Sequence, residues 1–171
     1  ARTAETLGLE VVRTDVVSSV RGYAVSSTKI RQCLEEGNVQ EAAVMLGCDY
    51  SLEGVVVAGN RIGRTIGFPT ANIQLYEPLK LVPSNGVYFT KVHTLGRDLY
   101  GMCNIGYRPT VGNGNARTIE TNIFGFDADI YGLDLRLTFV AKIRDEEKFA
   151  SLDELKKQLE KDREACLAIL Q

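Results

Sequence analysis

The sequence lacks the features of a membrane protein and of a basic nucleic-acid binder. No apolar run in its 171 residues approaches the roughly 18 residues of a membrane helix, and the N-terminus lacks the basic-then-apolar pattern of a secretory signal. Neither sign of charge is in excess, because 20 basic and 22 acidic residues leave a net charge of −2. We therefore expect no general attraction to nucleic acid and no membrane partner.

Histidine and cysteine are too scarce for the commonest metal and nucleophile sites. The single histidine, His93, lies in a strand-like stretch, and a His-based metal centre or a Ser-His-Asp triad would depend on it alone. The four cysteines form no C-x-x-C pair, and their spacing fits neither a zinc site nor a disulfide framework. We expect free thiols and a cytoplasmic location.

The composition, 44% hydrophobic and 25% charged, suits one globular domain with a small appendage. The hydrophobic pattern changes from period 3.6 to period 2 at Cys48. We therefore predict a helical part over residues 1–48 and a second domain over residues 49–171. The first residue is an alanine in mid-pattern, so we expect the sequence to be a piece of a longer protein.

Two short helices are predicted in the first part. Ser26 or Ser27 is a candidate N-cap for the first helix, and Asn38 begins a sequence that resembles a capping box for the second. Gly47 is the expected C-terminal stop of the second helix.

Short period-two segments with tight turns dominate the second part. Strands are predicted near residues 50–58, 73–75, 87–95, 99–105, 118–126 and 133–143. Because no long helix interrupts them, an antiparallel barrel or sandwich is favoured over a parallel βαβ sheet. A capping box at Ser151 and a leucine stripe from Leu152 to Leu170 predict a final helix that packs on the strands.

Residues 59–72 are the most informative stretch. Gly59, Gly63 and Gly67 recur every fourth residue, with Arg64 among them. Backbone N–H groups and arginine charge suit phosphate, but the same composition equally fits a mobile surface loop. A Walker A loop is disfavoured because Arg64 replaces its lysine and Phe68-Pro69 follows where a helix would begin.

Thr70 and Asn72 alternate with Ala71, so an extended backbone points both side chains to one face. Their oxygens are hard ligands that suit Mg²⁺ held together with nucleotide phosphate. Local hydrogen bonding in a turn is the alternative.

Glu120 stands on the predicted strand face that also carries Asn122, opposite Ile119 and Ile123. An acid in this position is either a solvated residue or a working carboxylate, and spacing alone favours the solvated residue.

The motif from Gly63-Arg64 to Gly67-Phe68-Pro69-Thr70-Ala71-Asn72 resembles the signature of riboflavin kinases, more narrowly the kinase module of bacterial bifunctional riboflavin kinase/FAD synthetases. Residues 104–110 (Asn-Ile-Gly-Tyr-Arg-Pro-Thr), the strand of Glu120 and residues 144–149 (Arg-Asp-Glu-Glu-Lys-Phe) resemble the same family. The resemblance covers residues 50 to about 162. It implies a mainly β fold, a six-stranded antiparallel Greek-key barrel with a C-terminal helix packed on it.

The resemblance also implies an activity: Mg²⁺-dependent transfer of phosphate from ATP to the terminal ribityl hydroxyl of riboflavin, giving FMN and ADP. In this family the acid at the position of Glu120 is the catalytic base. The implied nucleotide site comprises Gly59, Gly63, Arg64, Gly67, Thr70 and Asn72, of which Thr70 and Asn72 also hold Mg²⁺.

The implied flavin or substrate contacts are Arg108, Arg144 and Phe149. Each has a plainer alternative: a surface arginine for Arg108, and aromatic core packing for Phe149. Residues 111–117 are a candidate lid.

Residues 26–47 resemble the tail of the adenylyltransferase domain that precedes the kinase in bifunctional members. Ser27, Thr28 and Arg31 match its phosphate-binding motif. The catalytic motif of that domain is missing from this sequence, so we expect a plain capped helix here and no FAD synthesis from FMN.

Three alternatives stay open at this point. The donor could be CTP, as in archaeal riboflavin kinases of a different sequence pattern. The chain could be a non-catalytic flavin- or nucleotide-binding module, which would not need both Glu120 and the Thr70/Asn72 pair. An oligonucleotide-binding barrel is disfavoured by the acidic net charge and the few clustered aromatics.

Overall fold

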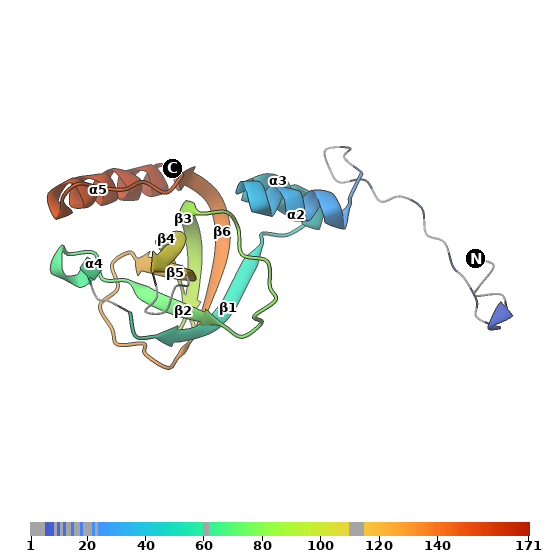
Figure 1. Ribbon diagram of the computed structural model, residues 1–171, viewed down its shortest axis with the longest axis horizontal. Helices are drawn as coiled ribbons and strands as arrows, with labels where there is room; N and C mark the ends of the chain where they lie inside the picture. Colours follow the sequence, from blue (N-terminus) through green and yellow to red (C-terminus); the bar gives the residue numbers. More distant parts are fainter. Residues whose placement is uncertain are drawn as a thin grey trace.

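A closed six-stranded antiparallel barrel forms the body of the computed structural model (Figure 1). The structure describes residues 6–8, 10, 12, 15, 18, 22, 24–59, 62–109 and 115–171. The strands are β1 (Ser51–Val57), β2 (Ala71–Leu75), β3 (Gly86–Thr94), β4 (Arg97–Pro109), β5 (Asn115–Ile123) and β6 (Asp134–Arg144).

The strand order around the barrel is β1-β2-β5-β4-β3-β6, and β1 pairs with β6 to close it. Strands β3, β4 and β5 follow one another as a meander, and β6 returns to pair with β3. This arrangement is a Greek key. The predicted fold class is therefore confirmed.

Among the described residues, the helices that accompany the barrel are α2 (Ser27–Glu36), α3 (Val39–Leu46), the single turn α4 (Ile62–Thr65) and α5 (Leu152–Ala168). Figure 1 shows α5 along one side of the barrel and the α2–α3 pair beyond its other side. In the described ranges, no helix is both long and apolar enough to cross a membrane.

The barrel interior follows the period-two alternation of its strands. On β6, Leu135, Leu137 and Phe139 are buried, while the residues between them are exposed or half-buried. The ring of Tyr88 meets Phe139 edge-to-face at 5.3 Å. Burying each such side chain contributes about 1.5–3 kcal/mol, so this face carries much of the folding free energy.

Helices α2 and α3 share this core. Leu34 from α2 and Val39 and Ala42 from α3 belong to the same apolar cluster as the barrel interior. The backbone N–H of Ser84, just before β3, also donates to the carbonyl of Leu34 (2.9 Å). The boundary at residue 48 stays a prediction, but the helical part packs on the barrel rather than standing apart from it.

A second apolar cluster lies on the outer face of the sheet under α5. It contains Val87, Phe89 and Met102 from the strands, Phe68, and Cys166 from α5. The predicted leucine stripe is wrong in its extent, because Leu152, Leu167 and Leu170 are 53%, 38% and 46% exposed. Leu155, Leu159 and Cys166 of the predicted stripe do turn inward, and positions 158 and 162 join them about one helix turn apart.

The helix ends confirm part of the predicted capping. The hydroxyl of Ser151 accepts from the N–H of Glu154 (3.2 Å), but the Glu154 carboxylate accepts from the N–H of Ala150 rather than Ser151. Ser26 and Asn38 occupy N-cap positions, as predicted, but neither side chain makes a capping hydrogen bond. Gly47 ends α3 in the left-handed conformation, as expected.

Candidate functional site

One row of paired residues crosses five neighbouring strands of the barrel. It runs in the order Arg144, Val87, Asn104, Glu120, Asn72, from β6 through β3, β4 and β5 to β2. Paired residues on adjacent strands direct their side chains to the same face of a sheet. Residues that are far apart in the sequence are therefore neighbours on the outer face of the barrel.

Four members of this row, all except Asn72, line a cavity of about 410 Å³. The part of the wall that comes from the outer cluster and α5 is apolar: Ile66, Phe68, Met102, Leu155 and Leu159. Its polar lining includes Thr70, Asn104, Glu120 and Asn122. The cavity is thus amphipathic, with an apolar wall against α5 and a polar wall along β4 and β5.

Glu120 and Thr70 meet in this cavity. The hydroxyl of Thr70 donates to Glu120 Oε2 over 3.4 Å. The side-chain amide of Asn122 donates to the carbonyl of Pro69 (2.7 Å) and so ties the end of the glycine-rich stretch to β5. The structure therefore brings the predicted base together with one of the two predicted Mg²⁺ ligands.

The three predicted glycines shape the stretch that precedes Thr70. A Cβ on Gly59 would overlap the side-chain amide of Asn72, and a Cβ on Gly63 would overlap the carbonyl of Phe68. Gly67 has a φ of +84°, which side-chain-bearing residues rarely adopt. Gly59 also explains how the buried amide of Asn72, only 9% exposed, fits beside the stretch.

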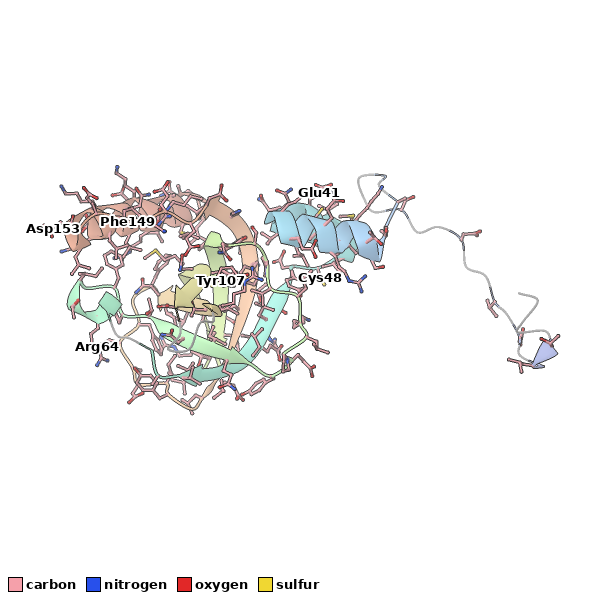
Figure 2. All side chains as sticks on the ribbon, viewed as in Figure 1. Glu41, Cys48, Arg64, Tyr107, Phe149 and Asp153 are labelled. Carbon is pink, nitrogen blue, oxygen red and sulfur yellow. The ribbon has the colours of Figure 1, made fainter. Side chains whose placement is uncertain are left out.

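Thr70 also lines a second, smaller cavity of about 80 Å³, together with Arg64, Ala71, Asp127 and Tyr131. Figure 2 shows Arg64 projecting from α4 on the side away from α5, whereas Phe149 lies against α5. Arg64 and Phe149 therefore belong to different cavities, and Thr70 is shared by both.

The guanidinium of Arg144 is held by a residue that the sequence analysis did not identify. Its Nε donates to both carboxylate oxygens of Asp162 (2.9 and 3.0 Å), and Nη2 donates to Oδ2 (2.8 Å). The guanidinium carbon also lies 5.6 Å from the ring centre of Phe149. Asp162 could have been noticed as an acid on the inward stripe of the final helix, between Leu159 and Cys166.

The family model for riboflavin kinase (Flavokinase) matches residues 46–170. The chain belongs to the riboflavin kinase family. Two bacterial proteins named bifunctional riboflavin kinase/FMN adenylyltransferase are similar to it, at 41% identity over 145 residues in Bacillus subtilis and 44% over 145 residues in Haemophilus influenzae. Each match covers 84% of this chain but 46% of the relative. The chain thus spans about half the length of these curated relatives.

Two solved structures resemble the fold. The crystal structure of riboflavin kinase from Trypanosoma brucei has a TM-score of 0.51 and 25% identity, over 71% of this chain and 76% of that one. A crystal structure described as a macrolide-efflux protein from Streptococcus pneumoniae has a TM-score of 0.83 and 39% identity, over 95% of this chain and 54% of that one.

Other predicted residues of this riboflavin kinase domain lie apart from the cavity or beyond what the structure describes. Ser27, Thr28 and Arg31 are exposed on α2 and do not line the cavity of Glu120. Arg108 belongs to β4, but its side chain lies outside the described part of the chain. Most of the predicted lid, residues 111–114, also lies outside it.

The residues around Thr70 suit Mg²⁺ bound with a nucleotide. The Thr70 hydroxyl, the Asn72 amide and the Glu120 carboxylate are hard oxygen donors, and Asn72 and Glu120 are paired in the sheet. Within the described residues, no group of three or more His, Cys, Asp or Glu side chains forms a cage for a metal. This donor set fits an ion that takes one or two protein ligands and keeps phosphate oxygens and water.

All four thiols are free, as expected. Burial raises the pKa of Cys103 in the barrel interior and of Cys166 on α5 to about 12. Neither thiol is therefore a nucleophile at neutral pH.

Proposed function

We propose that this domain transfers phosphate from Mg-ATP to the terminal ribityl hydroxyl of riboflavin, giving FMN and ADP. The observation that carries the proposal is the meeting of Glu120 and Thr70 at the polar wall of an amphipathic cavity. Membership of the riboflavin kinase family supports the same reaction.

The acceptor fits the larger cavity. Its apolar wall, with Phe149 beside α5, suits a flat ring system, and its polar wall suits a chain of hydroxyl groups. Arg144 and Glu120 are three strand spacings apart in one row, which is roughly 14 Å along the sheet. We assign the ring to the Arg144 end and the ribityl chain to the Glu120 end. The pairing of Arg144 with Asp162 favours a role in ligand orientation over charge stabilisation of phosphate.

We place the nucleotide phosphates on the other side of Thr70. Arg64 lines the second cavity there, and Gly59 to Gly67 bring backbone close to Thr70 and Asn72. Arginine and backbone N–H groups are suited to phosphate oxygens. When bound, Mg²⁺ would neutralise charge on the phosphates, and the oxygens of Thr70 and Asn72 would hold it.

Glu120 acts as the base in this scheme. Its carboxylate accepts the hydroxyl proton while the hydroxyl oxygen bonds to the γ-phosphorus and the bond to the departing ADP oxygen breaks. Because the transition state is loose, the protein contributes mainly position and charge. The shared position of Thr70 keeps acceptor and donor within reach of one another.

Two further points belong to the proposal. The relatives are bifunctional by name, and the family match lies on the kinase part, so we propose that this chain by itself does not convert FMN to FAD. We also propose a cytoplasmic location, which the four free thiols support.

The test is turnover by the purified chain with riboflavin, Mg²⁺ and ATP, with flavins separated by chromatography and detected by fluorescence. We expect FMN and no FAD. Glu120→Gln should lower turnover by at least about 100-fold, because general-base catalysis contributes about 10²–10⁴-fold. Glu53→Gln is the matched control, since Glu53 is a strand carboxylate about half exposed at an ion pair remote from the cavity.

The outcomes separate the alternatives. Near-full turnover by Glu120→Gln would remove Glu120 as the base. FMN formed from CTP but not from ATP would change the donor. Riboflavin binding without FMN from either donor would indicate a binding module instead of a kinase.

A further inference from the structure

A buried ion pair joins the end of β6 to α5. The side chain of Asp162 is 2% exposed and that of Arg144 is 15% exposed. Gln158, one turn earlier on α5, donates to Asp162 Oδ1 over 2.8 Å. The Asp162 carboxylate thus accepts from both Gln158 and Arg144 and holds the guanidinium in one orientation.

Stability alone is a poor explanation for this pair. Removing two charges from water costs several kcal/mol per ion, and well-packed apolar residues often replace such pairs without loss of stability. Asp162 lies on the inward stripe of α5 between Leu159 and Cys166, where an apolar side chain would suit the surrounding cluster. An ion pair in this setting instead fixes geometry, because each partner is costly in any other arrangement.

The ion pair of Arg144 and Asp162 fixes the geometry of the cavity wall. One guanidinium contacts three segments: Asp162 on α5, the carbonyl of Asp145 just after β6 (2.9 Å), and the ring of Phe149. Arg144 and Phe149 line the cavity, whereas Asp162 does not. Asp162 therefore acts on the cavity only through Arg144.

We propose that Asp162 is a positioning residue for the acceptor site: it orients Arg144, and through Arg144 the ring of Phe149, in the wall that receives the flat ring of the substrate. The inference rests on the proposed function for the identity of that substrate. The nucleotide side, at Thr70 and Arg64, lies toward the other end of the row and does not depend on this contact.

Asp162→Asn tests the proposal because it keeps the shape of the side chain and removes its charge. We expect KM for riboflavin to rise about tenfold, equivalent to about 1.4 kcal/mol of binding, with KM for ATP and kcat within about twofold of wild type. Direct riboflavin affinity, measured by quenching of flavin fluorescence, should fall by the same factor. Glu53→Gln removes one partner of the exposed Arg136–Glu53 pair and should change none of these values.

A lower melting temperature in Asp162→Asn with unchanged riboflavin KM and affinity would overturn the proposal, because the pair would then be purely structural. If Asp162→Asn does not fold, Phe149→Leu decides: unchanged riboflavin affinity would overturn the proposal, and a tenfold loss would support it. The riboflavin affinity also distinguishes a failure of the proposed kinase activity from a failure of the proposed role of Asp162. A wild-type chain that binds riboflavin without producing FMN contradicts the kinase, while the affinities of the variants still decide the role of Asp162.

Discussion

The two faces of β5 differ sharply although they alternate along the same nine residues. Ile119, Thr121 and Ile123 point into the barrel and are 5%, 0% and 7% exposed. Glu120 and Asn122 point outward, and both line the cavity. The outward residues carry the proposed base and the inward residues are buried in the core, although Thr121 and Ile123 also line the smaller cavity beside Thr70.

The same contrast holds around the barrel. The inner face is filled by the strands themselves together with Leu34 from α2, Val39 and Ala42 from α3, and Ile130 from the loop before β6. The outer face is covered by α5 only in part, and the cavity lies where the cover is incomplete. Stability and riboflavin binding should therefore respond to different substitutions.

The largest effect should come from the inner face. Leu137→Ala removes most of a side chain that is 0% exposed, and it should lower the free energy of unfolding by about 2–5 kcal/mol. Denaturant titration measures the loss, and KM for riboflavin should stay unchanged in the folded fraction. Leu79→Ala is the control, because Leu79 is 97% exposed and should change stability by less than about 0.5 kcal/mol. A shifted riboflavin KM in Leu137→Ala would show that the two faces are coupled.

A smaller effect is expected at the edge of the outer face. Gly59→Ala places a methyl group where the Asn72 amide now lies, so it should displace that amide. We expect the Mg²⁺ concentration for half-maximal turnover to rise about tenfold, or about 1.4 kcal/mol, with riboflavin affinity unchanged. Gly132→Ala, at a positive-φ turn with open space around it, should cost only stability. An unchanged Mg²⁺ requirement in Gly59→Ala would argue against Asn72 as a ligand.

The smallest expected effect is a difference in the rate of thiol labelling, which compares how tightly the inner and outer faces of the sheet are covered. With a pKa of about 12, Cys103 and Cys166 are thiolates only about once in 10⁴ at pH 8, and this fraction rises tenfold per pH unit. Alkylation followed by mass spectrometry should therefore modify exposed Cys48 first, with Cys33 slower because burial raises its pKa. Cys166 labelled much faster than Cys103 would mean that α5 opens while the barrel stays closed.

Local patterns in the sequence predicted a large part of this structure. The period-two pattern predicted a strand at residues 133–143, where the structure has β6, and the resemblance to riboflavin kinases supplied the barrel and the position of Glu120. Spacing alone had favoured a solvated Glu120, since a strand pattern cannot show that a distant helix will cover its outer face. The glycines of residues 59–67 were found, but their steric reasons, such as the space for Asn72, required coordinates.

The features that the sequence analysis missed or predicted wrongly depend on contacts between distant segments. The helix pattern could have placed Asp162 on the inward side of α5, but it could not show the partner of this residue, because Arg144 reaches it only after α5 folds back on the barrel. The predicted apolar stripe of the final helix was too long for the same reason, because Leu152 and Leu170 extend past the outer cluster. The register that aligns Asn72 with Glu120 is likewise set by pairing across the barrel.

The row from Arg144 to Asn72 has a consequence for the order of events in folding. Its members come from five strands, and two of its pairings, β2 with β5 and β3 with β6, join segments about 50 residues apart in the sequence. Such pairings between remote segments form slowly, because a long loop must first close at a cost in chain entropy, and only then can the stabilising contacts form. A refolding chain would therefore acquire its central hairpins early and its binding site only when β6 pairs with β3 and β2 pairs with β5.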